Sequence, residues 1–260
     1  MKKLIIILSI AITAASCQHV YYAPNTANIP MLTAKGETKI NALYSAGGDS
    51  EFGGGELQVA HALSDKFGLM LNFLAGGNSE DVESSGSSTS QIESGNGSYV
   101  EAAAGYLKPL DPGRKWVFEA FGGIGFGGVK NEYEHNDFSK VGTTKIFLQP
   151  SLSYKSAYFE IGFAPKLSMV NLNVKEESIS TDNEDARLDM TTIKEKPNFV
   201  VFEPALLLRA GGKGLKMHFG LSFSNYNAYD YLLSSAITEG VTGSIGISVN
   251  IKPKKNQLTL

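Results

Sequence analysis

Apolar and polar residues alternate along much of the chain, and residues 143–174 carry the longest such stretch. In its first half, Ile146 and Leu148 fall on one face of a strand, while Lys145 and Gln149 fall on the other. Successive side chains of a strand point to opposite faces, so each half has one apolar and one mostly polar face. Each half is about ten residues long, which is enough to cross a bilayer as a tilted strand. The stretch therefore predicts a membrane β-hairpin.

The same alternation predicts ten strands along the chain. Short connections are expected after strands two, four, six and eight, and long polar loops after strands one, three, five, seven and nine. This arrangement is typical of an even-stranded membrane barrel with short periplasmic turns and long outer loops. We therefore expect an all-β fold, an up-and-down antiparallel transmembrane β-barrel of about ten strands, with eight to twelve compatible because strand ends are hard to delimit. The strands are expected at residues 37–45, 56–63, 67–76, 99–108, 115–130, 143–154, 158–174, 198–209, 215–224 and 242–252.

The bulky apolar residues of nine strands keep to one face, which is expected to contact lipid. Tyr106, Trp116 and Tyr154 lie beside the short turns, where such barrels carry a girdle of aromatic residues. The alternative is a soluble lipocalin-like barrel with its apolar face turned inward, because alternation has the same period in both folds. Long loops on one side only favour the membrane barrel.

Composition and charge agree with this fold class. The 260 residues carry a formal net charge of −3, which gives no indication of nucleic-acid binding. Mean hydropathy is −0.08, and one long apolar run stands at the very start of the chain. A helical membrane protein would need further runs of about twenty apolar residues, so that class is excluded.

The first residues read as an export signal. Lys2 and Lys3 precede an apolar run that ends in small residues, which predicts a signal peptide over residues 1–16. The segment Ala14-Ala15-Ser16-Cys17 resembles a lipoprotein box, and this resemblance implies a diacylglycerol group on the Cys17 sulfur and a further acyl chain, such as palmitate, on its amine. The alternative is a plain signal peptide with an incidental cysteine. No acidic run follows Cys17, so we expect the lipid in the periplasmic leaflet of a bacterial outer membrane.

Residues 17–36 are expected to form a lipid-anchored tether without regular structure, because prolines and a glycine interrupt them. This segment resembles one found in a family of uncharacterised outer-membrane-type β-barrel lipoproteins, between the lipidated cysteine and the first strand. The resemblance brings no known activity with it. The tether is expected to cap or lie against the periplasmic mouth of the barrel; a recognition motif is the alternative. The matching residues are Tyr22, Pro24, Asn25, Asn28, Pro30, Leu32, Lys35, Gly36 and Glu37.

Residues 37–252 then make up the barrel, and residues 253–260 a periplasmic tail. The last strand carries Ser244, Gly246, Val249 and Ile251 at a spacing that resembles the signal read by barrel-assembly machinery. It departs from that signal in having Val249 where an aromatic residue is usual. The resemblance implies that this machinery is a partner during biogenesis.

The polar faces of the strands are expected to line the lumen and carry both acids and bases. They could form an ion path or an acid–base site, or a polar core in which each buried charge is paired. A barrel of about ten strands leaves little room for a wide pore, which favours the polar core. The expected lumen network is Glu101, Glu119, Lys145, Glu160, Lys166, Glu203, Arg209, Lys216 and His218.

His218 is the best catalytic candidate, since small membrane barrels that cleave or transfer acyl chains use such groups. However, counting back from the turn after residue 209 places His218 opposite Ala205 or Leu207, away from Glu203. We therefore expect no enzyme activity and no catalytic residue.

The expected outer loops carry three weaker candidates. His135-Asn136-Asp137 resembles loop-borne groups of omptin-type proteases but lacks a second paired-acid motif. The acidic run from Asp182 to Asp185 could hold Ca²⁺ but lacks the glycine and spacing of a calcium loop, so a solvated run is expected and no metal site is predicted. A third set of residues could stack on sugars or lie at the outer interface, and comprises Tyr226, Tyr229 and Tyr231.

Pro150, Pro165 and Pro204 fall on the lipid-facing side of three successive strands. Proline cannot donate a ladder hydrogen bond and is rare inside sheets. The three could mark bulges that adjust barrel shape. Alternatively, they form a lateral site, which would be a lipid-access gap or a docking face for another barrel.

Taken together, the sequence predicts a lipid-anchored outer-membrane barrel that acts as a structural or accessory subunit of an outer-membrane assembly. A small transport or ligand-binding barrel and a lipid-modifying enzyme are the alternatives. No cofactor is expected beyond the covalent lipid on Cys17. The expected partners are outer-membrane lipids, the assembly machinery and another outer-membrane protein, with no nucleic acid.

Overall fold

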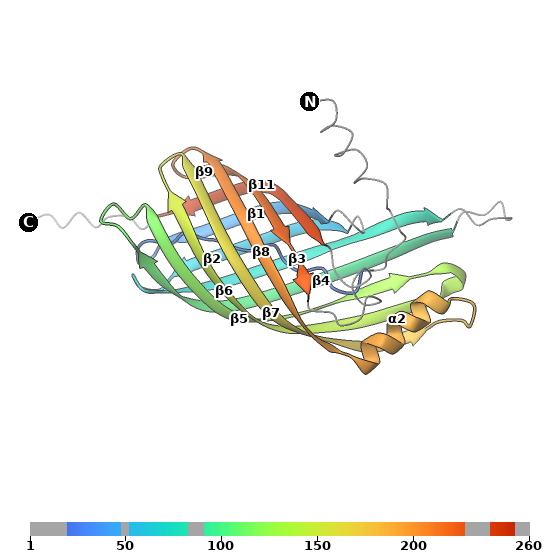
Figure 1. The fold of residues 1–260 in the computed structure, drawn as a ribbon. Coiled ribbons are helices and arrows are strands. Elements are labelled where there is room, and N and C mark those ends of the chain that lie inside the picture. Colours follow the sequence, from blue (N-terminus) through green and yellow to red (C-terminus); the bar gives the residue numbers. More distant parts are fainter. Residues whose placement is uncertain (1–19, 48–51, 83–90, 227–239, 253–260) are drawn as a thin grey trace, which may run out of the picture.

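Ten long antiparallel strands close into one barrel (Figure 1). The computed structural model describes residues 20–47, 52–82, 91–226 and 240–252. Each strand pairs with its neighbours in sequence, and the barrel closes through β11, which pairs with both β1 and β9. The expected up-and-down architecture of ten strands is therefore confirmed. The long strands are β1 (Thr38–Gly47), β2 (Gly53–Ala62), β3 (Phe67–Val82), β4 (Gln91–Pro109), β5 (Trp116–Glu132), β6 (Phe138–Lys155), β7 (Phe159–Ser178), β8 (Asn198–Gly211), β9 (Leu215–Phe223) and β11 (Val241–Ile251); the two-residue β10 (Asn225–Tyr226) pairs with β8.

The apolar faces of the strands point outward and the polar faces point inward. Leu148, Leu167 and Ile247 are each about half exposed on the outer surface, whereas Lys145 and Lys166 are buried. A belt of exposed apolar side chains around the whole wall is what a bilayer-spanning barrel presents to lipid. The soluble lipocalin-like alternative, which needs the apolar face inside, is therefore wrong.

The aromatic residues expected near the short turns lie there on the outer surface. Trp116 stands opposite Tyr154, and their rings meet edge to face at 5.3 Å between centroids. Phe67 stands opposite Tyr106 in the same arrangement at 6.2 Å. These pairs form part of a girdle at one end of the apolar belt.

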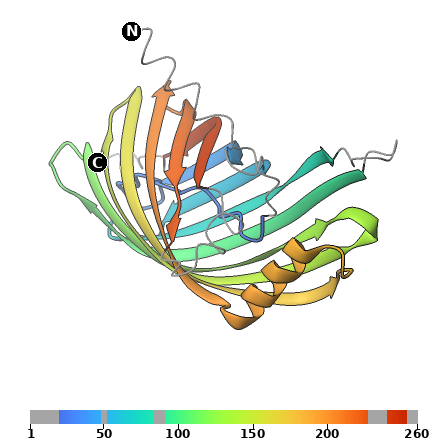
Figure 2. The ribbon, with the colours of Figure 1, turned by 45° about the vertical axis from the view of Figure 1, so that its right-hand side comes forward.

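The two ends of the barrel differ. One end, called here the turn end, carries the four short connections after β2, β4, β6 and β8, together with the start of β1 and the end of β11. At the opposite end, called here the loop end, β3 to β8 extend well past their shorter neighbours and form a high wall (Figures 1 and 2). The rim is low over β9, β11, β1 and β2, which have 9 to 11 residues, against 14 to 20 in the others.

Several expected loops are strand instead. These strands are longer than predicted: β1 ends at Gly47 and β2 begins at Gly53, β3 ends at Val82 and β4 begins at Gln91, and β5 ends at Glu132 and β6 begins at Phe138. The predicted loops at residues 77–97 and 131–142 are largely paired extensions of β3 to β6. Their polar and glycine-rich sequence pairs through the backbone but lacks an apolar face, because the extension does not need to contact lipid.

The predicted polar loop at residues 175–195 contains a helix, α2 (Glu184–Glu195). Asn183 caps it by accepting a hydrogen bond from the Ala186 N–H at 3.1 Å, and acidic residues in the first turn suit the helix dipole. Its buried side chains Met190 and Ile193 pack on apolar residues inside the loop end. The acidic run that could have suggested a calcium loop is therefore a helix start. No helix in the described ranges is both long and apolar enough to cross a membrane.

Candidate functional site

The lumen is filled by the N-terminal segment of the same chain. Residues 20–32, called here the plug, run inside the ring of strands as the dark-blue trace in Figures 1 and 2. Tyr21, Tyr22 and Ile29 have no exposed surface. The expectation that this segment caps the periplasmic mouth is wrong, because its backbone and side chains bond to inward-facing groups along the whole length of the barrel.

Near the turn end, three charged side chains hold the plug backbone. The Glu119 carboxylate accepts hydrogen bonds from the N–H groups of Met31, at 3.0 Å, and Leu32, at 2.9 Å. The Lys155 ammonium donates to the Met31 carbonyl at 2.7 Å, and the Arg209 guanidinium donates to the carbonyl of Ile29 at 3.0 Å. These charge-assisted bonds satisfy the groups that an irregular segment leaves free.

At mid-depth, amide side chains hold the plug. Asn28 donates to the Asn72 side-chain oxygen at 2.8 Å, and its carbonyl accepts from Gln149 at 2.7 Å. Thr26 donates through both its hydroxyl and its N–H to the Glu56 carboxylate. The expected motif residue Asn28 thus serves to fix the plug.

At the loop end, aromatic side chains anchor the plug. The Lys145 ammonium donates to the Tyr22 hydroxyl at 2.9 Å. Tyr21 donates to Asp189 of α2 at 2.9 Å, which joins the plug to the helix. Asn131 of β5 donates to the Val20 carbonyl at 3.1 Å.

Apolar contacts inside the lumen fix the depth of the plug. Ile29 and Met31 pack with Ala164 and Leu207 of the wall. A Cβ built at Gly162 would lie 2.9 Å from Met31 Cε and 3.1 Å from Ile29 Cγ2, so any larger residue there would force the Met31 and Ile29 side chains to shift.

The predicted lumen residues form two buried charge clusters. In the first, Glu160 of β7 contacts three cations: Lys39 at 3.0 Å, Arg209 at 3.1 Å and Lys216 at 3.1 Å. All four side chains are less than 5% exposed. His218 lies beside this cluster, where its Nδ1 is 3.3 Å from Arg209 Nε.

In the second cluster, Glu101 of β4 pairs with Lys145 and Lys166 and accepts a hydrogen bond from Asn72 at 3.1 Å. Glu203 stands opposite Lys166 in the ladder and accepts from the Ser168 hydroxyl at 2.7 Å. Glu119 belongs to neither cluster, since the plug is its partner.

The charges inside the lumen balance. Among the described strands and the residues that directly flank them, six glutamates and six cations point into the lumen, and each of these carboxylates has a bonded partner. Such a balanced and bonded interior has the character of a polar core. These groups are Glu37, Glu56, Glu101, Glu119, Glu160 and Glu203, with Lys39, Lys145, Lys155, Lys166, Arg209 and Lys216.

Four of these residues, Glu37, Lys39, Glu56 and Lys155, were missed by the sequence reasoning. Lys39 and Glu56 do lie at inward positions of an alternating pattern, so the period alone could have found them. Glu37 is part of the recognised N-terminal segment, but nothing in the sequence indicates that it meets Lys155.

Glu37 ties the start of β1 to the opposite wall at the turn end. Burial raises the pKa of its carboxyl, but the Lys155 ammonium and the hydrogen bonds from Thr33 and Asn250 outweigh burial and lower the pKa to about 2. The carboxylate is therefore held in its charged form at neutral pH.

The predicted register of His218 is wrong. His218 stands opposite Arg209, and Ser222 stands opposite Ala205. The β8–β9 ladder continues to the pair of Gly211 and Lys216, so the turn is tighter and begins later than the sequence count assumed. His218 and Glu203 are not brought together by the ladder.

The three predicted prolines form a row across the wall. Pro165 stands directly opposite Pro204. On the other side, the β6–β7 register runs from Leu148–Leu167 to Leu152–Phe163 without a shift, so Pro150 faces Pro165, and no pairs form between these two rungs. Because the register is unchanged, the expected bulges are absent from this described stretch.

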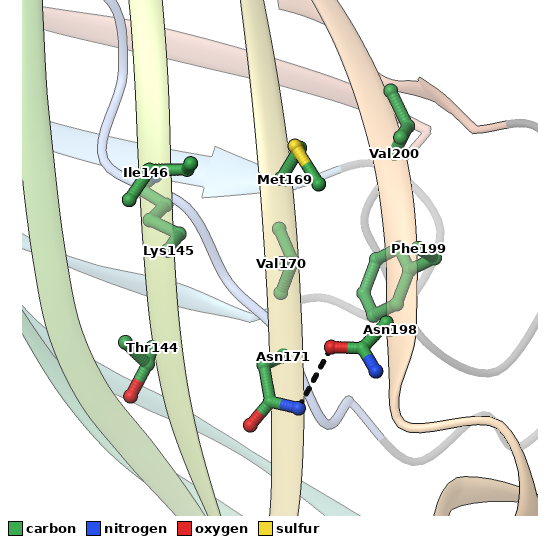
Figure 3. A pocket seen from close by; sticks show the side chains of 9 residues that line it. All are labelled: Thr144, Lys145, Ile146, Met169, Val170, Asn171, Asn198, Phe199 and Val200. Carbon is green, nitrogen blue, oxygen red and sulfur yellow. Dashed lines mark hydrogen bonds between the residues drawn. The ribbon is translucent and has the colours of Figure 1, made fainter.

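A shallow groove of about 320 Å³ lies on the wall at the loop-end side of this row (Figure 3). Ile146, Met169 and Val200 line it from three strands. At one edge, Asn171 donates to the Asn198 side-chain oxygen at 2.9 Å across the β7–β8 seam.

Among the weaker loop candidates, Asp137 has a structural role. Asp137 accepts hydrogen bonds from the Ser180 hydroxyl and N–H, which lower the pKa of its carboxyl. His135 is exposed in a 3₁₀ turn, Glu134–Asn136. Within the described ranges, no group of three or more metal-binding side chains is close enough to hold an ion. Cys17, Tyr229, Tyr231 and the tail at 253–260 lie outside the described residues.

Comparison with known proteins finds similarity only in structure. No family model matches the chain, and no curated protein matches its sequence. The chain is similar to KdgM porin, with 10% sequence identity and a TM-score of 0.32 over 82% of this chain and 99% of that one. It is also similar to CdiB from Acinetobacter baumannii, with 7% identity and a TM-score of 0.26 over 84% of this chain and 60% of that one.

Proposed function

We propose that this chain is a bacterial outer-membrane barrel that acts without catalysis, as a structural or accessory subunit of an outer-membrane assembly. The observation that carries the proposal is the plug, which fills the lumen with bonds to inward groups from the turn end to the loop end. A barrel closed in this way offers its outer wall and its loop end, rather than a channel, to other molecules.

The location follows from the outer surface and the two unlike ends. An apolar belt with an aromatic girdle is what a bilayer requires. Membrane barrels of this kind keep short turns on the periplasmic side and their larger extensions outside, so the turn end is assigned to the periplasm and the loop end, where β3 to β8 extend past their neighbours, to the exterior. The predicted signal peptide and the lipid on Cys17 agree with export to this membrane.

The row of Pro150, Pro165 and Pro204 is proposed as the docking face for another barrel. It interrupts the hydrogen-bond ladder within the lipid-facing wall, and the groove lined by Ile146 and Met169 adjoins it. A partner strand or side chain that fills this weak part of the wall would stabilise both proteins.

Transport through the lumen is the alternative, and conductance in planar bilayers tests it. The wild-type protein is expected to give no steady conductance steps, because the lumen holds the plug and its bonded partners. Regular steps from the intact protein would favour the transport function.

A lipid-modifying enzyme is the other alternative, with His218 as its candidate group. His218 is 1% exposed and lies beside Arg209, inside the barrel and away from the lipid-facing surface. His218→Ala is therefore expected to leave the cell's lipid composition unchanged, and a change in acyl chains would contradict the proposal.

The experiment that tests the accessory function is a pull-down of the tagged mature protein from its native membrane in mild detergent, followed by mass spectrometry. A second outer-membrane protein in stoichiometric amount is the expected result. Recovery of the protein as a solitary monomer at several detergent concentrations would overturn the accessory function.

A further inference from the structure

The plug has a direction. It leaves β1 at the turn end, and its Leu32 bonds to Glu119, close to the start of β5 at Trp116. Twelve residues earlier in the chain, Val20 bonds to Asn131, next to the end of the same strand at Glu132. Traced toward the N-terminus, the chain therefore enters at the turn end and reaches the loop end.

The distance that the plug covers along the barrel axis is comparable with the thickness of a membrane. Glu119 and Asn131 are twelve residues apart on β5, which is roughly 40 Å along a strand at about 3.3 Å per residue. With a strand tilt near 45°, the rise is roughly 28 Å, close to the hydrocarbon thickness of a bilayer. The two ends of the plug thus lie near opposite faces of the membrane.

Covalent geometry limits where the predicted lipid can lie. Cys17 precedes Val20 by three residues, which span at most about 11 Å even when fully extended. That length cannot return through the lumen to the turn end.

We propose that the mature N-terminus emerges at the loop end, so that the lipid predicted on Cys17 enters the membrane leaflet on that side. This rests on the proposed membrane-spanning function, and it replaces the periplasmic leaflet expected from the sequence. The N-terminal lipid and the two barrel termini then lie on opposite sides of the membrane.

The shape of the loop end provides an exit toward lipid. Val20 packs in the same apolar cluster as Phe52, which directly precedes β2. This position is on the low rim, where β1, β2, β9 and β11 end well below the high wall of β3 to β8.

The path also constrains assembly. Acyl chains partition strongly into the hydrocarbon of a membrane, so drawing them through a polar lumen is strongly unfavourable. The barrel therefore closes around a plug that is already in place.

Epitope tags test this topology in intact cells. One tag is inserted after His19 in the full-length protein, a second in the loop at Asp182, and a third in the turn at Pro112. Antibody binding is compared before and after permeabilising the outer membrane. The tag at His19 is expected to match the tag at Asp182, and acyl-chain labelling that Cys17→Ser abolishes would show that the anchor is present.

If the tag at His19 instead matches the tag at Pro112, the proposal is overturned while the membrane-spanning function stands. If the tags at Asp182 and Pro112 behave identically, the barrel does not separate two compartments and the proposed function itself fails. Heat-dependent gel mobility of each tagged protein verifies that the barrel is folded.

Discussion

Pro165 of β7 lies directly opposite Pro204 of β8, and both rings face outward. In an antiparallel pair, opposed residues alternate between exchanging two hydrogen bonds and exchanging none. In a pair that exchanges none, the backbone nitrogen of Pro165 points toward β6 and that of Pro204 points toward β9. The ladder is interrupted in those two directions: β6–β7 pairing stops between Leu148 and Leu152, and β9 ends at Phe223 before pairing resumes in β10. The β7–β8 ladder between the two prolines is continuous.

The wall at this row is expected to contact the partner of the proposed assembly. A photoreactive side chain placed at Leu167, two residues from Pro165, should crosslink to another outer-membrane protein in living cells. Leu57 on β2 is a matched control, since both leucines are 49% exposed on the outer face. Crosslinks of equal yield to the same protein from both positions, or no adduct from Leu167, would remove the lateral site.

Replacing one proline of this row by a residue with a backbone N–H should stabilise the barrel wall between β6 and β7. Pro165→Ala permits a hydrogen bond between β6 and β7, which is expected to stabilise the barrel by about 1 kcal/mol. Hydrogen exchange measured by mass spectrometry should show a slowly exchanging amide at residue 165, in the β7 peptide spanning Phe163 to Leu167. Unchanged protection would mean that the interruption has a cause other than the missing donor.

The alternation of apolar and polar residues was sufficient to predict the barrel, its ten strands and the inward position of Glu160 and Arg209. A wall with lipid on its outer face and a filled lumen on its inner face requires apolar and polar side chains to alternate along its strands. The polar extensions of β3 to β6 could not be predicted in the same way, because no apolar face marks a strand beyond the membrane.

The plug could not be predicted from sequence for a different reason. Apolar and polar residues do not alternate regularly in the plug, and its hydrogen-bond partners are far away in the sequence, as Met31 and Glu119 illustrate. A segment rich in proline and asparagine is as suitable for a surface tether as for a lumen, so only the closed barrel decides between them. By contrast, α2 had a local signal in Asn183 and in the spacing of Ala186, Met190 and Ile193.

The fit of the plug against β7 predicts the effect of filling Gly162. Gly162→Leu would force a side chain against Ile29 and Met31, and overpacking of this kind costs about 1–3 kcal/mol. Thermal unfolding in detergent, followed by gel mobility, should occur at a lower temperature. Gly55→Leu is the matched control, because a Cβ at Gly55 meets nothing within 4 Å. Equal losses from both variants would argue against a plug in this position.

The ion pair of Glu37 and Lys155 predicts a loss of stability in acid. The pKa of Glu37 is about 2 in the folded protein against 4.5 for the free side chain, so the unfolded chain binds the proton more tightly. The interactions of the ionised Glu37 carboxylate with Lys155, Thr33 and Asn250 therefore contribute fully above about pH 4.5, by roughly 3 kcal/mol in all, and this contribution is lost as pH falls toward 2. Unfolding curves of the wild type and Glu37→Gln should converge over that range, and a constant difference between pH 7 and pH 2.5 would refute the assignment.

The cations around Glu160 make it the most sensitive of the lumen carboxylates. Glu160→Gln keeps the shape of the side chain but leaves Lys39, Arg209 and Lys216 without their shared negative charge. Removing one partner of a buried ion pair typically costs about 3–5 kcal/mol, because the remaining charges stay desolvated. Chemical unfolding in detergent should show a loss of this size.

The exposed pair of Lys140 and Glu176 supplies the control for that loss. Glu176→Gln is expected to change stability by less than about 1 kcal/mol, since water screens a surface pair. A second substitution, Lys216→Met, should recover part of the loss in Glu160→Gln by removing one of the three unpaired cations. If Glu160→Gln were no more harmful than Glu176→Gln, the lumen would have to admit enough water to screen its charges, which would contradict a lumen closed by the plug.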